Sequence, residues 1–432
     1  MNKSDSERIA SVLENVGYKT TSKMNEADLI VVNMCSVRQS AVDRVYGLTP
    51  KFKKLKTKNY KLKTVLTGCV LKKDLRKFRD NFDYLLSIKT LPFWPKFLKE
   101  NSYFSFNIQK NSNYLKIGSR YSNNFSAFIP ISNGCNNFCS YCVVPFTRGP
   151  LICRDYKEIL KEVKNVIQKG YKEIWLLGQN VNDYKSPTTS LVNFAKLLNL
   201  VNDIPGNFWI RFTSPHPKDF SNELIDAMAE GKKVTEYLNL PVQSGDNEIL
   251  KKMNRPYTVE QYKDLIKKIR QKIPNITLST DIIVGFPGET EKQFENTAKL
   301  FKEIKYDMAY IARYSPRPQT AAVNLDDNIS KKEKKRREKI LTEILKKTAH
   351  EKNKKYIGKE VGVLINTKKN NFLIGKTRTY KTVKMPFVRP QQNTRHLPTG
   401  QAGKIQDTRL VGSFVKVKII NALPWGLKGE VV

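Results

Sequence analysis

The residues best suited to chemistry are three cysteines crowded into eight positions, Cys135, Cys139 and Cys142, with the spacing C-x3-C-x2-C. Three thiolates on one short loop can bind three irons of a four-iron, four-sulfur cluster. The fourth iron then lacks a protein ligand and can coordinate a small molecule, such as the amino and carboxylate groups of S-adenosylmethionine. Structural zinc is the alternative, but it needs four protein ligands, and the nearest further thiol is Cys153, eleven residues on.

Two further cysteines, Cys35 and Cys69, each follow a short apolar run, at residues 29–32 and 64–67. We expect these runs to be buried strands that alternate with helices. Open parallel sheets place their ligand sites beyond the carboxyl ends of such strands, so the matched positions favour a shared site. Taken singly, each cysteine could equally be a buried structural thiol.

Polar and glycine residues close two other predicted strands. Gly178, Gln179 and Asn180 end one of them, where backbone groups could meet a cofactor or form an ordinary strand–helix turn. Gly285 ends another, where a glycine permits either a close approach to a ligand or a tight turn.

Three charged or titratable residues have both a functional and a structural interpretation. His216 lies between two prolines and is predicted to be a rigid turn element rather than a substrate contact. Arg148 and Arg317 could bind phosphate or carboxylate groups, with structural ion pairing as the alternative.

The apolar pattern predicts the elements that carry these residues. Six strands are expected, at residues 127–131, 174–177, 208–212, 237–242, 278–284 and 308–314. Helical periodicity separates them, for example at 156–168 and 259–272, so an incomplete parallel barrel, open on one side, is predicted at 121–355. Its last helix, within 329–356, is rich in Lys and Glu and is expected to be solvated.

The two ends of the chain predict two further domains, giving an α/β protein of three parts. Residues 1–115 are predicted to form an open parallel α/β sheet domain. The domain is expected to begin with a helix that is capped by Ser4 and Glu7. Residues 356–432 contain short strands between turns, which is typical of a small all-β barrel. Residues 388–408 interrupt it without apolar periodicity and are predicted to be a disordered inserted loop.

Composition limits the classes of function. The chain has 432 residues and a formal net charge of +37, which points to a polyanionic partner, nucleic acid before membrane. Lysine-rich composition can also be a genomic background. No run of about 18 apolar residues is present, and the first residues lack the order of a secretory signal, so a membrane span and a disulfide framework are not expected.

The chain resembles the radical S-adenosylmethionine methylthiotransferases over nearly its whole length. Beyond the cysteine loop, the resemblance rests on ordered stretches at residues 143–149, 176–182, 211–217, 240–245, 281–290 and 314–318. The stretch 178–182, Gly-Gln-Asn-Val-Asn, resembles the branch that modifies tRNA rather than the branch that modifies a ribosomal protein.

The resemblance implies an iron–sulfur enzyme. A cluster on Cys135, Cys139 and Cys142 would cleave S-adenosylmethionine to a 5′-deoxyadenosyl radical, which removes hydrogen from C2 of an isopentenyl-modified adenosine beside the anticodon. C2 has no acidic proton, so cofactor chemistry is needed there. A second cluster, with Cys35 and Cys69 as ligands, would hold or supply the sulfur, and another S-adenosylmethionine the methyl group.

The resemblance also implies binding residues and partners. The cofactor-binding set is Gly178, Gln179, Asn180, Gln243 and Gly285. The partners are tRNA and an electron donor such as flavodoxin or ferredoxin, and the enzyme would be a cytoplasmic monomer. The carboxyl-terminal module resembles the RNA-binding TRAM domain. The alternatives are the same chemistry on threonylcarbamoyl-adenosine tRNA or a ribosomal protein, and an RNA-binding member that has lost sulfur insertion.

Three departures from the family pattern stand out. The family normally has a first cysteine in Gly-Cys-Gln-Met-Asn, and this chain aligns from that Met, at Met1, so we expect a start placed too late or a truncated sequence. Cys35 and Cys69 alone would bind a second cluster weakly. Leu151, Cys153, Asn239 and Gln319 stand where the family has Glu, Ser, His and Gly, and with the 388–408 insertion they predict a diverged member.

Overall fold

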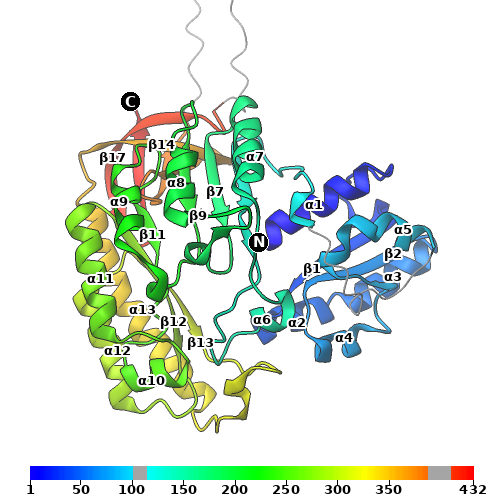
Figure 1. The fold of residues 1–432 in the computed structure, drawn as a ribbon, viewed down its shortest axis with the longest axis horizontal. Coiled ribbons are helices and arrows are strands. Elements are labelled where there is room, and N and C mark those ends of the chain that lie inside the picture. Colours follow the sequence, from blue (N-terminus) through cyan, green and yellow to red (C-terminus); the bar gives the residue numbers. More distant parts are fainter. Residues whose placement is uncertain (101–113, 388–409) are drawn as a thin grey trace, which may run out of the picture.

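A computed structural model describes residues 1–100, 114–387 and 410–432, so the predicted 388–408 insertion lies outside the described residues. Figure 1 shows a small amino-terminal α/β region beside a larger barrel, with an all-β barrel packed against the end of the latter. The structure confirms the predicted fold class.

The amino-terminal sheet has the order β1-β2-β3, with β1 (Leu29–Cys35), β2 (Lys63–Cys69) and β3 (Tyr84–Leu85) all parallel. Two helical layers cover it (Figure 1): α1 (Asn2–Glu14) and α5 (Trp94–Lys99) pack on one face, and α2 (Gln39–Tyr46), α3 (Thr49–Lys58) and α4 (Lys72–Phe78) on the other. The register pairs Cys35 with Cys69, so both end neighbouring strands, as predicted.

The predicted cap of the first helix is wrong. Met1 is the N-cap of α1, and Ser4 lies inside the helix, where its hydroxyl donates to the carbonyl of Phe128 at 3.1 Å. A tertiary contact with the barrel therefore replaces the local capping bond.

The central barrel consists of two three-stranded parallel sheets. Their strands are β4 (Ser126–Pro130), β7 (Glu173–Leu177), β10 (Trp209–Phe212), β11 (Tyr237–Asn239), β12 (Thr277–Val284) and β13 (Met308–Arg313). A parallel bridge between Ile210 and Val234 joins β10 to the segment before β11. The outer helices are α7 (Tyr156–Gln168), α8 (Phe194–Asn202), α9 (Asn222–Glu230), α11 (Val259–Lys272), α12 (Glu291–Ile304) and α13 (Lys331–Lys354).

Shorter elements decorate the loops. They are the helices α6 (Val144–Arg148) and α10 (Asn247–Lys252), the pair β5 (Ser132–Asn133) and β6 (Ile152–Cys153), and the hairpin β8 (Lys185–Ser186) and β9 (Thr189–Asn193). Single 3-10 turns lie at Met24–Glu26, Ile88–Phe93, Tyr114–Lys116, Val181–Asp183, Pro217–Asp219 and Ala321–Asn324.

Helix α13 is less solvated than predicted. Lys334 and Arg337 are buried, and they pair with Asp327 at 2.6 Å and with Glu289 at 2.8 Å. The reason is that α13 packs against β13 and α12, so part of its charged surface faces the barrel.

The carboxyl-terminal strands close into a barrel in the order β14-β15-β16-β18-β17. These strands are β14 (Glu360–Lys369), β15 (Phe372–Thr377), β16 (Thr382–Pro386), β17 (Phe414–Leu423) and β18 (Gly426–Val431), the last of which was not predicted. The turn after β15 docks on the central barrel, because the buried Arg211 donates to the carbonyls of Thr377 and Arg378, both at 2.9 Å.

Candidate functional site

The predicted site residues of the barrel all follow the carboxyl ends of its strands. Cys135 lies beyond β4 and β5, Gln179 beyond β7, Gln243 beyond β11 and Gly285 beyond β12. Parallel barrels expose these ends at one mouth, which is where such folds carry their chemistry.

The cysteine loop begins with a sharp turn at Gly134. This residue has φ +84°, and a Cβ there would lie 2.0 Å from the carbonyl oxygen of Pro150, so only glycine fits. The Gly134 N–H donates to Oε1 of Gln179 at 2.6 Å, and the Cys135 N–H donates to the carbonyl of Gly149 at 3.2 Å. One member of the predicted cofactor set therefore orients the loop that carries the thiols.

The far side of the loop is tied to two other barrel segments. Ser140 donates through its N–H to Met253 at 3.0 Å and through its hydroxyl to Lys252 at 2.8 Å. The Ala322 N–H donates to the Ser140 carbonyl at 2.7 Å. The three cysteines are thus held on a framework rather than on a free loop.

Two of the loop thiols, Cys135 and Cys142, lie in surroundings that disfavour the thiolate form. All three are free, Cys135 and Cys139 are buried, and Cys142 is half-buried. Burial raises the pKa of Cys135 and raises that of Cys142 to about 12, and neighbouring thiol charge adds to both shifts. Among the described residues no group of three or more His, Cys, Asp or Glu is arranged to hold a metal ion.

Polar atoms without partners surround the mouth. Ser132 Oγ, Asn137 Nδ2, Asn180 Oδ1 and His216 Nε2 are buried without a hydrogen-bond partner. Buried polar groups are normally satisfied, so four such atoms near the cysteine loop fit a polar ligand such as S-adenosylmethionine. Asn180 also donates to Asp219 at 2.9 Å, which fixes its orientation.

His216 is held as a neutral, immobile side chain. The backbone N–H of His216 donates to Oδ1 of Asn182 at 2.7 Å, and the ring Nδ1 accepts from the backbone N–H of Lys218 at 3.2 Å, in agreement with the predicted turn. Burial first, then the charges of Arg255 and Lys218, lower the pKa of His216 to about 2. Because Nδ1 accepts the hydrogen bond from Lys218, the proton of the neutral ring lies on Nε2, which is left free to donate to a ligand.

The remaining predicted cofactor residues differ in their surroundings. A Cβ on Gly178 would lie 2.7 Å from Ser132 Oγ, so this glycine allows close packing at the loop. Gln243 has φ +73°, and its backbone bonds to Asp281 and Ile283 on β12. Gly285 contacts no loop cysteine: its N–H donates to Glu289 at 2.7 Å, and the side chain of Lys334 lies over its Cα.

Arg255 and Tyr257 lie near the cysteine loop although the sequence did not predict them as site residues. Arg255 is buried, and its Nη1 lies 3.6 Å from the Cys139 sulfur, while Nη2 donates to the Pro241 carbonyl at 2.8 Å. The Tyr257 ring lies between Arg255 and His216. An Arg-Pro-Tyr stretch after a short helix carries no metal-ligand signal by itself, so only the fold reveals it.

The amino-terminal cysteines meet the barrel through Arg148. Its Nε donates to the Cys69 sulfur at 3.0 Å, and its Nη2 pairs with Asp5 at 2.6 Å. Burial raises the pKa of Cys69; Arg148 opposes that shift and Cys35 adds to it. Arg148 also donates to Asn133 at 3.1 Å, so one guanidinium links Cys69 to the short strand before the cysteine loop, and ion pairing is its observed role.

A second buried ion pair, Arg317–Asp74 at 2.7 Å, joins the two regions, so the ion-pairing alternative also applies to Arg317. Of the residues that depart from the family pattern, Asn239 donates to Asp281 at 2.9 Å, and Leu151 donates from its backbone to Asn136 at 3.0 Å.

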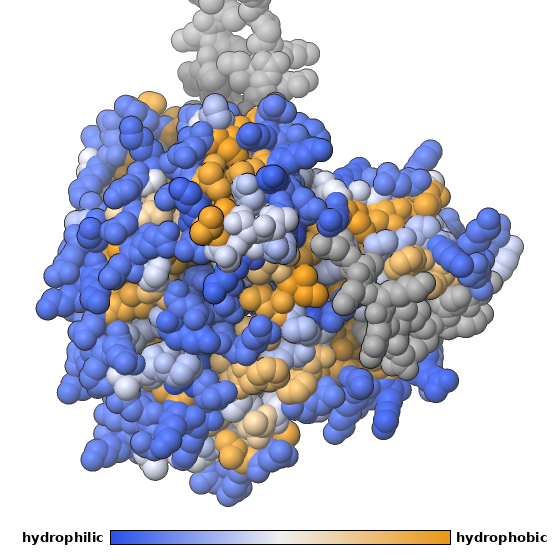
Figure 2. All heavy atoms as spheres, viewed as in Figure 1, coloured by the Kyte–Doolittle hydropathy of each residue, from blue (hydrophilic) through white to orange (hydrophobic). Residues whose placement is uncertain are grey.

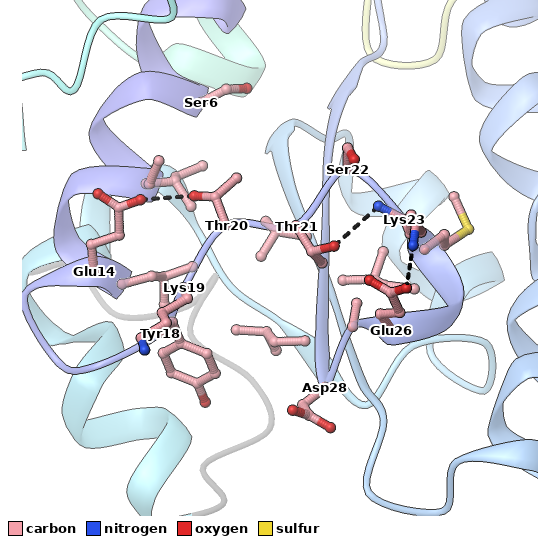
Figure 3. Close-up of a pocket in the computed structure, with 18 of the residues that line it drawn as sticks. Ser6, Glu14, Tyr18, Lys19, Thr20, Thr21, Ser22, Lys23, Glu26 and Asp28 are labelled. Carbon is pink, nitrogen blue, oxygen red and sulfur yellow. Dashed lines mark hydrogen bonds and ion pairs between the residues drawn. The ribbon is translucent and has the colours of Figure 1, made fainter.

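A separate hollow of about 800 Å³ lies between α1, the segment 17–28 and β1 (Figure 3). Within the described sheet, β1 pairs only with β2, so its other edge lines this hollow. The polar side chains there pair with each other, Thr20 with Glu14 and Lys23 with Glu26, both at 2.7 Å (Figure 3). Chemistry-bearing residues do not converge in it.

No helix in the described part of the chain combines the length and the hydropathy that a membrane span requires.

Comparisons with known proteins agree with this geometry. The model of the radical SAM superfamily matches residues 129–301, and that of the uncharacterized protein family UPF0004 matches residues 1–87. A Clostridium botulinum protein named tRNA-2-methylthio-N(6)-dimethylallyladenosine synthase is 41% identical over 443 residues, covering 100% of this chain and 94% of that protein. A Thermoanaerobacter sp. protein of the same name is 40% identical over 446 residues, covering 100% and 90%.

Solved structures share the fold. The radical S-adenosylmethionine methyltransferase TsrM from Kitasatospora setae, with cobalamin and a 4Fe-4S cluster bound, has a TM-score of 0.52 at 15% identity, covering 74% of this chain and 73% of that one. The cobalamin-dependent S-adenosylmethionine radical enzyme OxsB has a TM-score of 0.50 at 12% identity, covering 80% and 50%. At these identities the likeness concerns the fold alone.

Proposed function

This chain belongs to the radical S-adenosylmethionine methylthiotransferase family, and we propose that it adds a methylthio group at C2 of N6-dimethylallyladenosine in tRNA. The observation that carries the proposal is the loop of Cys135, Cys139 and Cys142, held at the mouth of the six-stranded barrel. Full-length identity of about 40% to synthases of that name supports the substrate.

The three loop cysteines would hold the 4Fe-4S cluster, which supplies the electron that cleaves S-adenosylmethionine and starts radical chemistry at C2. Gln179 orients the loop, and Asn180 and Ser132 offer unsatisfied polar atoms to the cofactor. Gly178, Gln243 and Gly285 would bring backbone close to it, although the N–H of Gly285 is already bonded to Glu289.

The surface beside the loop suits an apolar substituent on the base. Phe138 and Phe146 are exposed, and Figure 2 shows hydrophobic side chains gathered at the centre of the face, where the amino-terminal region meets the barrel. A dimethylallyl group packed against such side chains would remove apolar surface from water, which is favourable. A threonylcarbamoyl group would instead bring a charged carboxylate to this apolar surface, which is unfavourable. This contrast favours dimethylallyladenosine over the threonylcarbamoyl alternative.

The second cluster of the family would take Cys35 and Cys69 as ligands. Their pairing at the ends of β1 and β2 suits a shared site, but the described residues supply two thiols there, and one of them accepts a bond from Arg148. This observation favours a second candidate function, in which the protein binds tRNA and cleaves S-adenosylmethionine without inserting sulfur.

We further propose a cytoplasmic, monomeric enzyme that takes its electron from a small carrier such as flavodoxin or ferredoxin. A one-electron reductant is a requirement of the chemistry, and the net charge of +37 suits an acidic carrier as well as tRNA.

The test uses anaerobically reconstituted protein with S-adenosylmethionine, a reductant and tRNA that carries dimethylallyladenosine. Mass spectrometry of the digested nucleosides should show one hydrogen replaced by methylthio, with Cys135→Ala as the inactive control. Formation of 5′-deoxyadenosine without that product would support the second candidate. Iron analysis separates them too, since two full clusters need about eight irons per chain and one needs about four. Product on threonylcarbamoyl-adenosine tRNA or a ribosomal protein alone would overturn the proposed substrate.

A further inference from the structure

The amino-terminal region carries a strongly basic segment with few acidic residues. Residues 49–79 include twelve Lys and Arg and one acidic residue, Asp74, whereas the whole chain has 77 Lys and Arg and 40 Asp and Glu. A genomic lysine bias would add lysines without removing acidic residues, so it does not explain this imbalance. We call the exposed members of the segment the basic face: Lys51, Lys53, Lys54, Lys58, Lys61, Lys63, Lys72, Lys73, Arg76, Lys77 and Arg79.

The fold places the members on α3 and α4 on one side of the sheet, while Lys61 and Lys63 lie at the amino end of β2. The apolar residues of α3 and α4, Phe52, Leu75 and Phe78, pack inward against the sheet, so the charged positions between them point outward. In Figure 1, α2, α3 and α4 lie together below the sheet, and Figure 2 shows hydrophilic side chains along the lower edge of this region.

The charges of the basic face are uncompensated. None of its members forms an ion pair with another described residue; Lys56 of the same helix pairs with Asp83, and Asp74 is buried against Arg317. On α3, Lys51, Lys54 and Lys58 are spaced three and four residues apart, a spacing at which like charges destabilise a helix. Folding alone therefore gains nothing from this arrangement, and a polyanion would offset its cost.

An exposed aromatic residue accompanies the charges. Tyr60 is 85% exposed, and Lys61 Nζ lies 6.0 Å from its ring centroid. Surfaces that bind single-stranded nucleic acid combine basic groups for phosphates with aromatic rings for bases, whereas an anionic membrane would favour an apolar face beneath the charges.

The basic face borders the candidate site. Asp74 of α4 and Gln39 of α2 both bond to Arg317, which follows β13 at the mouth of the barrel. An RNA that places one nucleotide at the cysteine loop can therefore run on over α2 and α4.

We propose that the basic face binds the phosphate backbone of the tRNA substrate outside the modified nucleotide, as a second RNA surface besides the carboxyl-terminal barrel. This inference rests on the proposed function. Each lysine that contacts a phosphate releases counterions, so affinity should fall steeply with salt.

The test compares two triple variants of equal charge change. Lys51→Glu/Lys54→Glu/Lys58→Glu alters the basic face, and Lys292→Glu/Lys299→Glu/Lys302→Glu alters exposed lysines of α12. We expect the first to weaken binding of dimethylallyladenosine-containing tRNA at least tenfold at about 0.1 M salt and to reduce the slope of log Kd against log salt by about 2–3. The α12 control should stay within about twofold.

Lys51→Gln/Lys54→Gln/Lys58→Gln controls for misfolding of the Glu triple. It should also weaken tRNA binding, by a smaller factor, with an unchanged thermal midpoint. Equal losses in both Glu triples would overturn the proposal in favour of net charge alone. Normal tRNA binding by the first triple, with or without loss of binding to phosphatidylglycerol vesicles, would overturn it while the proposed function stands. Failure of the wild-type chain to bind this tRNA would instead overturn the proposed substrate, and the inference with it.

Discussion

At the scale of single residues, a buried arginine lies against a sulfur atom at each group of thiols. Arg255 lies 3.6 Å from the Cys139 sulfur, and Arg148 lies 3.0 Å from that of Cys69. Hydrogen bonds to sulfur and nearby positive charge stabilise the reduced, more negative state of an iron–sulfur cluster. We infer that these two arginines would tune clusters bound at these thiols.

Replacing Arg255 should shift the reduction potential of the loop cluster. Arg255→Met removes charge and donors together, so we expect a more negative midpoint, by on the order of 1 kcal/mol or about 40 mV for one electron. Arg255→Lys keeps the positive charge, so its midpoint potential should lie between those of Arg255→Met and the wild type. Potentiometric titration followed by electron paramagnetic resonance measures the shift. Arg211→Met, which removes another buried arginine without a cysteine contact, serves as control, and an equal shift there would contradict the assignment.

His216 should make the barrel sensitive to acid. Its pKa is lowered from 6.5 to about 2, so between these values the unfolded chain binds a proton that the folded chain excludes. The free energy of unfolding therefore falls as pH falls through this window, by about 2 kcal/mol between pH 7 and pH 5. His216→Asn keeps an acceptor for the Lys218 N–H and should lose this part of the pH dependence in urea titrations. Identical pH profiles would show that His216 is not the group responsible.

At the scale of elements, the apolar periodicity of the sequence predicted the helices and strands that local interactions determine. The helices at 156–168 and 259–272 and all six barrel strands were predictable, because buried parallel strands are continuous apolar runs. The thiol loop was predictable from spacing alone. The partners of the loop, Arg255 and Ser140 with Met253, were not, since they come together only when distant strand ends meet at one mouth.

The misses have physical causes. Strand β18 contains two glycines and few apolar residues, and its stability comes from pairing with β17 and β16 rather than from its own pattern. Lys334 and Arg337 looked solvated because buried charges are rare, yet each is paired inside the fold.

The turn that starts the cysteine loop should tolerate no side chain. Gly134→Ala would place a Cβ 2.0 Å from the Pro150 carbonyl oxygen at φ +84°. We expect a loss of more than about 2 kcal/mol in the free energy of unfolding, together with poor iron retention after reconstitution. Gly118→Ala, at a position with no atom within 4 Å of the added Cβ, should match the wild type in both measurements. Normal iron content in Gly134→Ala would refute this account of the loop.

At the scale of the whole molecule, buried charges join the three parts of the chain. Arg148–Asp5 and Arg317–Asp74 fix the amino-terminal region to the barrel mouth, and Lys381–Asp307 at 2.7 Å fixes the carboxyl-terminal barrel to the other end. Both thiol groups and the basic face thus keep fixed positions relative to one another, which a substrate that spans several domains requires.

The Arg317–Asp74 pair should couple the amino-terminal region to the barrel. Both side chains are buried, and Asp74 also accepts from the Ser36 hydroxyl at 3.2 Å. Asp74→Leu leaves the guanidinium buried without its counter-charge, so we expect a loss of about 3–5 kcal/mol in urea unfolding and earlier melting of the amino-terminal region.

The double variant Asp74→Leu/Arg317→Met supplies the decisive comparison. Apolar side chains can replace a buried ion pair with little loss of stability, so the double variant should be more stable than either single variant. We expect a coupling free energy of about 2–3 kcal/mol between the two positions. The exposed pair Lys23–Glu26 is the matched control, since breaking it should cost less than about 1 kcal/mol. If the losses in the free energy of unfolding of the two single variants simply add in the double variant, the two charges act independently. Packing, rather than this ion pair, would then hold the amino-terminal region against the barrel.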